Sequence, residues 1–332
     1  MSARNRQWLL ASRPRGPVEE SNFRLAESDV PAPRDGEVLV RVRFLSLDPY
    51  MRGRMDEAKS YAPSQKLGEP MVGGTVGEVV ESRNPRFAKG DLVVGMGGWQ
   101  EWFASDGKTL TKVPRGLPES VYLGAVGMPG ITAWHGLLHI GKPKAGETVV
   151  VSAASGAVGS VVGQLAKLRG CRAVGVAGGP AKCAHVVNDL GFDACVDYKA
   201  DGFREAFKAA VPNGIDVVFE NVGGPILDAS LARMNPFGRI AVCGLIAGYG
   251  GEDISLRNVR SILVNRLTVQ GFIVSDHLDL WPEAMKELGA AVASGKIRFR
   301  ETIAQGLESA PRAFIGLLRG ENLGKQLVKV SG

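Results

Sequence analysis

Residues 147–168 read ETVVVSAASGAVGSVVGQLAKL, and this stretch decides the kind of fold the chain can adopt. Thr148–Ser152 is a short, apolar, β-branched run, which predicts a buried parallel strand. Residues 153–159 are all small except Val158, and beyond them apolar side chains recur at helical spacing. A strand, a tight turn of small residues and an amphipathic helix are typical of the opening of a dinucleotide-binding βαβ unit.

The chemistry of the turn suits a pyrophosphate group. Gly156 and Gly159 let the backbone approach an anion closely, and the next helix offers N–H groups and the positive end of its dipole. The glycine pattern is incomplete, because Ala154 stands where the usual G-x-G-x-x-G motif has its first glycine. This stretch alone therefore does not exclude the alternative, a strand-to-helix turn that binds no ligand.

The composition is that of a globular protein with two domains. The chain has 332 residues, of which 45% are hydrophobic and 22% charged, enough for a sizeable core. The net charge is +6, but Lys and Arg are scattered, so we expect no nucleic-acid partner. The four cysteines have neither metal-ligand nor C-x-x-C spacing, and none precedes Cys171, which indicates free thiols in a reducing compartment.

The N-terminus and the apolar runs indicate a cytoplasmic protein. The first ten residues, MSARNRQWLL, lack the apolar core of a signal peptide. No apolar run approaches the roughly 18–20 residues that a membrane span needs. We therefore expect no membrane partner.

Residues 1–125 are predicted to be mostly β-structure. Strands are expected at residues 37–45, 71–80 and 91–95. Because no helices intervene, a small sandwich or barrel is favoured.

A helix is expected at residues 127–139 and carries two histidines. His135 and His139 are four residues apart, which is the spacing of a zinc pair on one helix face. The residues between them are Gly, Leu and Leu, so no glutamate is placed to act as a base. We therefore interpret both as histidines at an interface or on the helix surface.

Strands and helices alternate between residues 147 and 275. After the opening unit, strands are expected at 171–177, 194–198, 215–220, 239–243 and 267–273, and helices at 182–190, 203–211, 225–234 and 281–294. This alternation predicts an α/β fold with a doubly wound parallel sheet. The tail ends in an alternating strand at 325–330, and because the sheet is already complete we expect the tail to fold back onto the first domain. The expected division is 1–125, 126–298 and a C-terminal return at 299–332.

The choice of nucleotide depends on the end of the second strand, which faces the adenosine ribose in such folds. NAD enzymes tend to place an acidic residue there, but residues 176–182 read VAGGPAK, with no acid and with Lys182 at the end. NADP carries an additional 2′-phosphate of roughly −1.5 to −2 charge. Lys182 is therefore predicted to bind this phosphate, the alternative being a solvated lysine at a helix start.

Two common dehydrogenase chemistries are excluded by missing residues. A short-chain dehydrogenase needs Tyr-x-x-x-Lys, and no tyrosine of this chain has a lysine four residues later. A zinc alcohol dehydrogenase needs thiolate and imidazole ligands in its first domain, yet no cysteine precedes Cys171 and no histidine precedes His135. The hydride must then go to a substrate that needs no metal Lewis acid. An alkene conjugated to a carbonyl qualifies, because hydrogen-bond donors can stabilise the developing enolate.

Motifs along the whole chain converge on one family. They read LDPYMRGRM at 47–55, SAASGAVG at 152–159, GFDACVDYK at 191–199, FENVGG at 219–224, CGLIAGY at 243–249, GFIVSDH at 271–277 and ENLGKQLVKV at 321–330. In them the chain resembles the zinc-independent medium-chain dehydrogenase/reductases. Within that family it is similar to the branch of leukotriene B4 12-hydroxydehydrogenase/prostaglandin reductases, alkenal double-bond reductases and curcumin reductases, whose own pattern includes the alanine at Ala154.

The resemblance implies a Rossmann domain, a GroES-like, mostly β catalytic domain that the C-terminal tail completes, and a homodimer. It implies NADPH-dependent reduction of α,β-unsaturated ketones and aldehydes, such as 15-oxo-prostaglandin-like or curcumin-like substrates, without a metal. The residues implied to bind NADPH are Ser155, Gly156, Ala157, Val158, Gly159, Gly178, Lys182, Tyr198, Asn221, Cys243, Gly244, Leu245, Ile246, Tyr249, Phe272, Ile273, Val274 and Asn322. Gly179 departs from the serine that the family often has there, so use of NADH stays open.

Two tyrosines are the candidate catalytic residues. Tyr249 matches a family tyrosine proposed to hydrogen-bond the substrate carbonyl or enolate, and it follows a strand's carboxyl end, where ligands bind in open α/β sheets. A role in packing on the cofactor stays open for it. Tyr50 either lines the substrate or holds the D-P-Y turn. The rival functions are a quinone reductase of the same superfamily and a non-catalytic NADPH-binding sensor.

Overall fold

The computed structural model describes residues 4–331, and their contacts divide the chain into two compact units. The first unit holds the chain up to Leu123 together with the segment from Glu301 onward, and the second holds Gly124–Arg300. No helix in the described part of the chain is both long and apolar enough to cross a membrane.

The second unit is built on a six-stranded parallel sheet in the order β10-β9-β8-β11-β12-β13. The strands are β8 Thr148–Ser152, β9 Arg172–Ala177, β10 Ala194–Asp197, β11 Ile215–Glu220, β12 Met234–Val242 and β13 Thr268–Gly271. This order is that of a doubly wound Rossmann sheet. The strands are added toward one edge of the sheet up to β10 and toward the other edge from β11 onward, so the order switches between β8 and β11. The predicted α/β fold is therefore confirmed.

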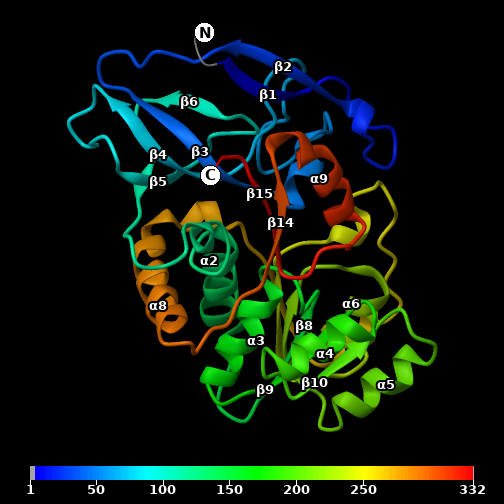
Figure 1. Ribbon diagram of the computed structural model, residues 1–332. Helices are drawn as coiled ribbons and strands as arrows, with labels where there is room; N and C mark the ends of the chain where they lie inside the picture. The colour runs from blue at the N-terminus through cyan, green and yellow to red at the C-terminus, as the bar shows by residue number, and fades with distance from the viewer. Residues whose placement is uncertain (1–3, 332) are drawn as a thin grey trace. The chain divides into compact units, whose positions relative to one another are not determined.

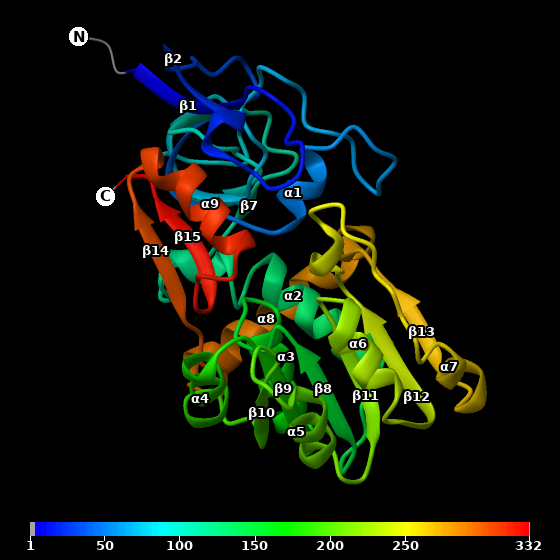
Figure 2. The same ribbon diagram turned by 90° about the vertical axis from the view of Figure 1, so that its right-hand side faces the viewer.

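Helices precede, connect and follow these strands (Figure 2). They are α2 Met128–His135, α3 Gly159–Leu168, α4 Pro180–Asn188, α5 Phe203–Ala210, α6 Gly224–Leu231, α7 Arg260–Val264 and α8 Trp281–Ala293. Of these, α3, α4 and α6 pack against the sheet. Because helices cover a parallel sheet, its central strands are apolar throughout: all five residues of β8 are buried, and Val150 and Val218 are fully inaccessible to solvent.

The first unit is mostly β-structure, with a sheet in the order β14-β15-β3-β4-β5-β7, a strand β6 paired to β3, and a separate β1-β2 pair. Its strands are β1 Arg4–Leu10, β2 Phe23–Asp29, β3 Val38–Ser46, β4 Thr75–Ser82, β5 Leu92–Gly95, β6 Trp102–Ser105, β7 Thr111–Lys112, β14 Glu301–Gln305 and β15 Lys325–Lys329. Its two α-helices are α1 Tyr50–Arg54 and α9 Ala310–Leu318. Trp99 stacks on Phe23 at 5.2 Å between ring centroids, which places an aromatic pair in this unit's core.

The C-terminal tail belongs to the first unit. β15 pairs antiparallel with β3, so that Leu327 lies opposite Ser46, and β14 pairs parallel with β15 (Figure 1). The chain therefore leaves the first unit after Leu123 and returns to it at Glu301.

Four expectations about single elements are wrong. The helix expected at 225–234 ends at Leu231, because Met234 already begins β12, and the strand expected at 239–243 therefore starts at Met234. The strand expected at 71–80 begins only at Thr75. The helix expected at 127–139 turns into a π-helix after His135, over Gly136–Gly141. At Gly136 a Cβ would lie 2.4 Å from the ring of Phe272, so tertiary packing and not local periodicity shapes this segment.

Candidate functional site

The turn between β8 and α3 has the geometry of an anion-binding turn. Ala154 donates its N–H to the carbonyl of Val176 on β9, and Gly156 donates to Ala153, so the turn is closed on itself. Helix α3 begins at Gly159 and no side chain caps its N-terminus. A Cβ at Gly159 would lie 2.4 Å from the carbonyl oxygen of Ala153, so only glycine lets the helix begin this close to the strand.

The ends of β9 and β10 bring a tyrosine and two lysines together. A Cβ at Gly178 would lie 2.9 Å from the ring of Tyr198, so Gly178 leaves room for this half-exposed ring. The Lys199 ammonium lies 5.9 Å from the centroid of the same ring. Burial, and then the charge of Lys199, lowers the pKa of Lys182. Two cations therefore lie at the position predicted for the 2′-phosphate, and Lys199 is one that the sequence did not single out.

The end of β11 is organised by Glu220, which the sequence also did not single out. This residue is fully buried, and its Oε1 accepts the hydroxyl of Ser152 and the N–H groups of Val222 and Gly223 at 2.6–2.9 Å. Asn221 in turn donates its side-chain amide to the carbonyl of Ser152 at 2.8 Å. Asn221 is thus tied to β8 at the point where the strand order reverses.

Removing the Glu220 acceptor is expected to destabilise the protein. Glu220→Ala leaves buried N–H donors at Val222 and Gly223 without an acceptor and opens a cavity, so we expect a loss of about 2–4 kcal/mol in the free energy of unfolding. Glu220→Gln keeps an acceptor oxygen and is expected to cost about 1 kcal/mol or less. Urea unfolding measures both, and equal losses in the two variants would contradict this role.

The loop after β12 carries Tyr249. The N–H groups of Cys243 and Gly244 both donate to the carbonyl of Glu220, which bends the chain over the end of β11. A Cβ at Gly244 would lie 3.3 Å from the Tyr249 hydroxyl, so this hydroxyl points back toward the carboxyl ends of the strands. Burial, and then the charge of Glu220, raises the pKa of Cys243 to about 12, so it stays a thiol. The half-buried Leu245 and Ile246 lead into this turn, η4 Ile246–Gly248.

The segment after β13 contributes Phe272, Ile273 and Val274. The Phe272 ring is buried and packs edge-on against Phe219 at 6.1 Å between centroids. Its side chain is therefore part of the unit's core, while Ile273 and Val274 are only partly buried. All these segments follow the carboxyl ends of parallel strands, which lie at one edge of the sheet, where open α/β sheets bind ligands.

The first unit carries the two remaining predicted residues. Tyr50 is the first residue of α1, and burial, and then Asp48, raises its pKa well above the ordinary value of a tyrosine. It therefore stays protonated and able to donate a hydrogen bond. Asn322 is half-buried before β15 and donates its side-chain amide to the carbonyl of Gly324 at 2.7 Å.

The two histidines of the α2 segment, which the sequence places at an interface or on the helix surface, differ in their surroundings. His135 is buried, and its ring stacks on those of His139 at 5.2 Å and His277 at 4.4 Å. Burial, and then these two histidines, lowers the pKa of His135 to about 4, so it is neutral at neutral pH. His277 comes from η5 Val274–Leu280, a contact that no spacing along α2 reveals. Across residues 4–331, no group of three or more His, Cys, Asp or Glu side chains is placed to hold a metal.

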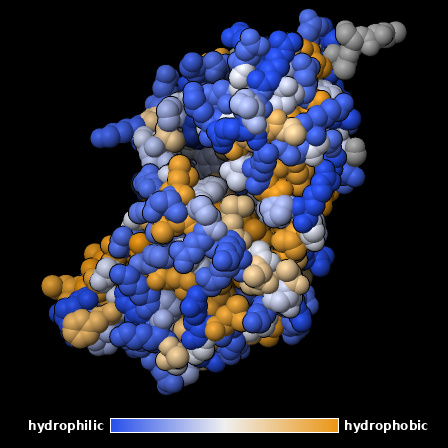
Figure 3. Space-filling model, turned by 90° about the vertical axis from the view of Figure 1, so that its left-hand side faces the viewer, coloured by the Kyte–Doolittle hydropathy of each residue, from blue (hydrophilic) through white to orange (hydrophobic). Residues whose placement is uncertain are grey.

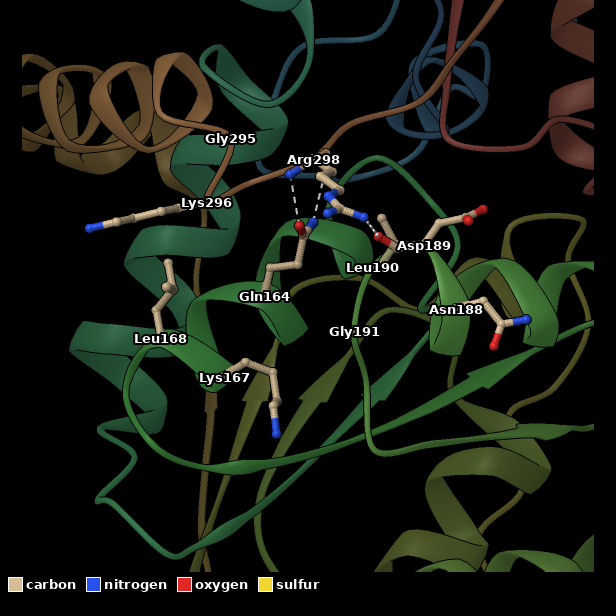
Figure 4. A pocket seen from close by; sticks show the side chains of 10 residues that line it. All are labelled: Gln164, Lys167, Leu168, Asn188, Asp189, Leu190, Gly191, Gly295, Lys296 and Arg298. Atoms are coloured by element: carbon tan, nitrogen blue, oxygen red, sulfur yellow. Dashed lines mark hydrogen bonds between the residues drawn. The ribbon is translucent and has the colours of Figure 1, made fainter.

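A cavity of 330 Å³ in the second unit lies away from this edge (Figure 4). It is lined by the last turns of α3 and α4 and by the segment after α8, where Gln164 exchanges two hydrogen bonds of 2.8 Å with the backbone of Arg298. Since these helix ends lead into the starts of β9 and β10, the cavity lies at the amino ends of the strands and does not belong to the candidate site.

Two family models match the chain. One, described as the N-terminal domain of oxidoreductase, matches residues 6–113, and the other, described as zinc-binding dehydrogenase, matches residues 157–290.

Individual relatives match nearly the whole chain. It is 50% identical to the NADPH-dependent curcumin reductase of Escherichia coli, over 99% of this chain and 98% of the relative. It is 45% identical to the 2-alkenal reductase (NADP(+)-dependent) of Nicotiana tabacum, over 89% and 88%. It is 43% identical to prostaglandin reductase 1 of Mus musculus, over 98% of both. Among solved structures, CurA of Vibrio vulnificus in complex with NADPH is 46% identical and matches with a TM-score of 0.94, over 98% of this chain and 99% of that one.

Proposed function

Because the chain belongs to the medium-chain dehydrogenase/reductases, in the branch of curcumin, alkenal and prostaglandin reductases, and is an NADPH-dependent oxidoreductase, we propose that it reduces the C=C bond of α,β-unsaturated ketones and aldehydes. The observation that carries this proposal is the 45–50% identity to a curcumin reductase and a 2-alkenal reductase. Curcumin and 2-alkenals both contain an alkene conjugated to a carbonyl group.

The residues around the sheet edge fit NADPH. In the proposal, the uncapped start of α3 and the backbone of residues 156–159 bind the pyrophosphate. Lys182 and Lys199 bind the 2′-phosphate beside the ring of Tyr198. Asn221 and residues 272–274 bind the nicotinamide end. When bound, NADPH supplies the hydride.

The proposed role of Tyr249 is to stabilise charge on the substrate oxygen. Hydride attack on the β-carbon leaves negative charge on the carbonyl oxygen as an enolate, and a hydroxyl donor aimed at that oxygen lowers the barrier. Tyr249 has its hydroxyl at the ligand-binding edge of the sheet, close to Gly244. Tyr50, whose raised pKa keeps it protonated, is proposed to line the substrate as a second donor.

A panel of acceptors tests the proposed function. The loss of NADPH absorbance is followed with an enone, an enal and a quinone of similar size. Faster turnover of the enone and the enal supports the proposal, whereas preference for the quinone favours a quinone reductase. No turnover with any of them, despite NADPH binding measured by fluorescence, favours a sensor.

We also propose a homodimer formed at β13. This strand ends the sheet on one side, and its four residues are exposed. Large apolar side chains surround it, among them Leu263 with 78% and Phe237 with 67% of its surface exposed. Figure 3 shows apolar surface gathered at its lower left, at the end of the second unit where β13 and α7 lie. An exposed strand edge with apolar neighbours suits pairing with a second copy.

Charge at this edge is expected to separate the dimer. Leu263→Glu combined with Val269→Lys places charges among apolar side chains that a second copy would bury. Size-exclusion chromatography with light scattering should show a monomer for this variant and a dimer for the wild type and for Leu25→Glu, a matched exposed leucine of the first unit. A wild-type monomer at micromolar concentration would rule the proposed dimer out.

A further inference from the structure

Two sequence motifs that the proposed chemistry leaves largely unexplained meet in a buried ion pair. Asp48 comes from the LDPYMRGRM motif and Lys325 from the ENLGKQLVKV motif, 277 residues later. The two residues are only 5% and 3% exposed, and the Lys325 ammonium donates to the Asp48 carboxylate at 2.7 Å. Both belong to the first unit.

The pair holds the turn that follows β3. The Lys325 ammonium also donates to the carbonyl of Leu47 at 2.6 Å, and the second carboxylate oxygen of Asp48 accepts the hydroxyl of Ser46. The N–H of Leu47 donates to the carbonyl of Gln326 at 3.2 Å. The turn is therefore fixed to β15, the strand of the C-terminal tail. The bonds run through the N–H and carbonyl groups of Leu47 and through the carboxylate of Asp48.

This turn leads directly into Tyr50. Pro49 is the N-cap of α1 and Tyr50 is its first residue, while Met51 donates its N–H to the carbonyl of Asp48 at 3.1 Å. The position of Asp48 therefore sets where α1 begins and where the Tyr50 side chain starts.

A third charged group faces the same lysine. Glu301 lies beside Lys325 in the β14–β15 register; one of its carboxylate oxygens accepts the hydroxyl of Ser120, and the other is buried without a partner. Burial lowers the pKa of Lys325, and Asp48 and then Glu301 oppose that effect.

Stability alone is a weak reason for such a pair. Well-packed apolar residues of similar volume are often as stabilising as a buried ion pair, because desolvation offsets the attraction. What the pair provides is a single geometry, with three directed hydrogen bonds converging on the segment Ser46–Asp48. We propose that Lys325 and Asp48 are positioning residues, which hold the turn so that Tyr50 keeps one orientation toward the substrate. This proposal rests on the proposed enone reduction.

A double-mutant cycle separates positioning from general stability. Lys325→Met is expected to lower kcat for enone reduction about fivefold, with KM for NADPH unchanged, because the donor at Tyr50 loses its fixed orientation. In a Tyr50→Phe background the same change should lower kcat no further, while Lys325→Arg should recover part of the loss. Lys112→Met, which removes an exposed lysine paired with Asp91, is the control and should leave kcat unchanged. Multiplicative losses in the double variant would overturn the proposal.

Fluorine NMR gives a readout that does not depend on turnover. With 3-fluorotyrosine at all five tyrosines, the resonance missing in Tyr50→Phe is that of Tyr50. Lys325→Met and the isosteric Asp48→Asn should each shift or broaden this resonance, and Lys112→Met should not. Asp48→Asn is the milder variant and is used if Lys325→Met does not fold. An unchanged Tyr50 resonance in Asp48→Asn would overturn the proposal that the ion pair positions Tyr50. Absence of enone turnover in the wild type would refute the proposed function while this signal still tests the turn.

Discussion

Replacing Lys182 and Lys199 together by glutamate is expected to raise the KM for NADPH about 100-fold, while the KM for NADH changes by less than about threefold. The physical reason is the 2′-phosphate, the group that distinguishes the two nucleotides. In the proposed site each lysine contributes a charge-assisted contact to the phosphate, worth about a factor of ten, and each glutamate adds repulsion.

The structure explains why both lysines have to change. Burial, and then the charge of Lys199, lowers the pKa of Lys182, so the two ammonium groups lie close enough to repel each other across the ends of β9 and β10. Asp197, the acid of this region, accepts the N–H groups of Gly179 and Lys199 and shapes the turn. Lys182→Glu alone should therefore give a smaller loss, because Lys199 remains to attract the phosphate.

Steady-state kinetics with both nucleotides at a saturating enone measure this effect. Lys208→Glu, an exposed lysine on α5 of the same unit, is the control for a lysine-to-glutamate change away from the site, and its change in net charge matches that of Lys182→Glu alone. If the double variant weakens NADPH and NADH equally, the lysines do not bind the 2′-phosphate.

The parts of the fold that could be predicted are those that a local pattern of apolar residues indicates. The strand Thr148–Ser152 and the helix after it appear where the sequence places them, because burial of both faces demands apolar residues and the close helix start demands Gly159. The strands β1 and β2 were not predicted, because β1 has no regular alternation of buried and exposed side chains and β2 has only Phe23 buried.

The parts of the site that could not be predicted depend on side chains from different strands meeting. Glu220 looks like any acidic residue at a strand end until the structure shows it fully buried against Ser152. Lys199 follows Tyr198 in sequence, yet its relation to Lys182 arises only because β10 lies beside β9. The stacking of His277 on His135 is likewise a long-range contact. Spacing along the chain predicts which elements carry a site. It does not predict which further side chains lie at the site because of contacts between distant parts of the chain.

Tyr249→Phe is expected to lower kcat for enone reduction tenfold or more, by about the factor that loss of one oxyanion donor costs. The ring is conserved in this change, so any packing of the ring on the nicotinamide persists. Only the hydroxyl is lost, and it matters most when charge has developed on the substrate oxygen. The KM for NADPH should therefore stay within about twofold, since a group that acts in the transition state changes kcat and leaves ground-state binding alone.

Stopped-flow measurement of hydride transfer tests this directly, because slow product release would otherwise hide the effect in kcat. Tyr122→Phe is the control: it removes a buried hydroxyl that donates to the carbonyl of Pro114 in the first unit, and its transfer rate should equal the wild type's. An unchanged rate in Tyr249→Phe with intact NADPH binding would leave Tyr249 only a packing role. A comparable loss in Tyr50→Phe, with the double variant no worse than either single variant, would mean that the two hydroxyls act on the same oxygen as one unit.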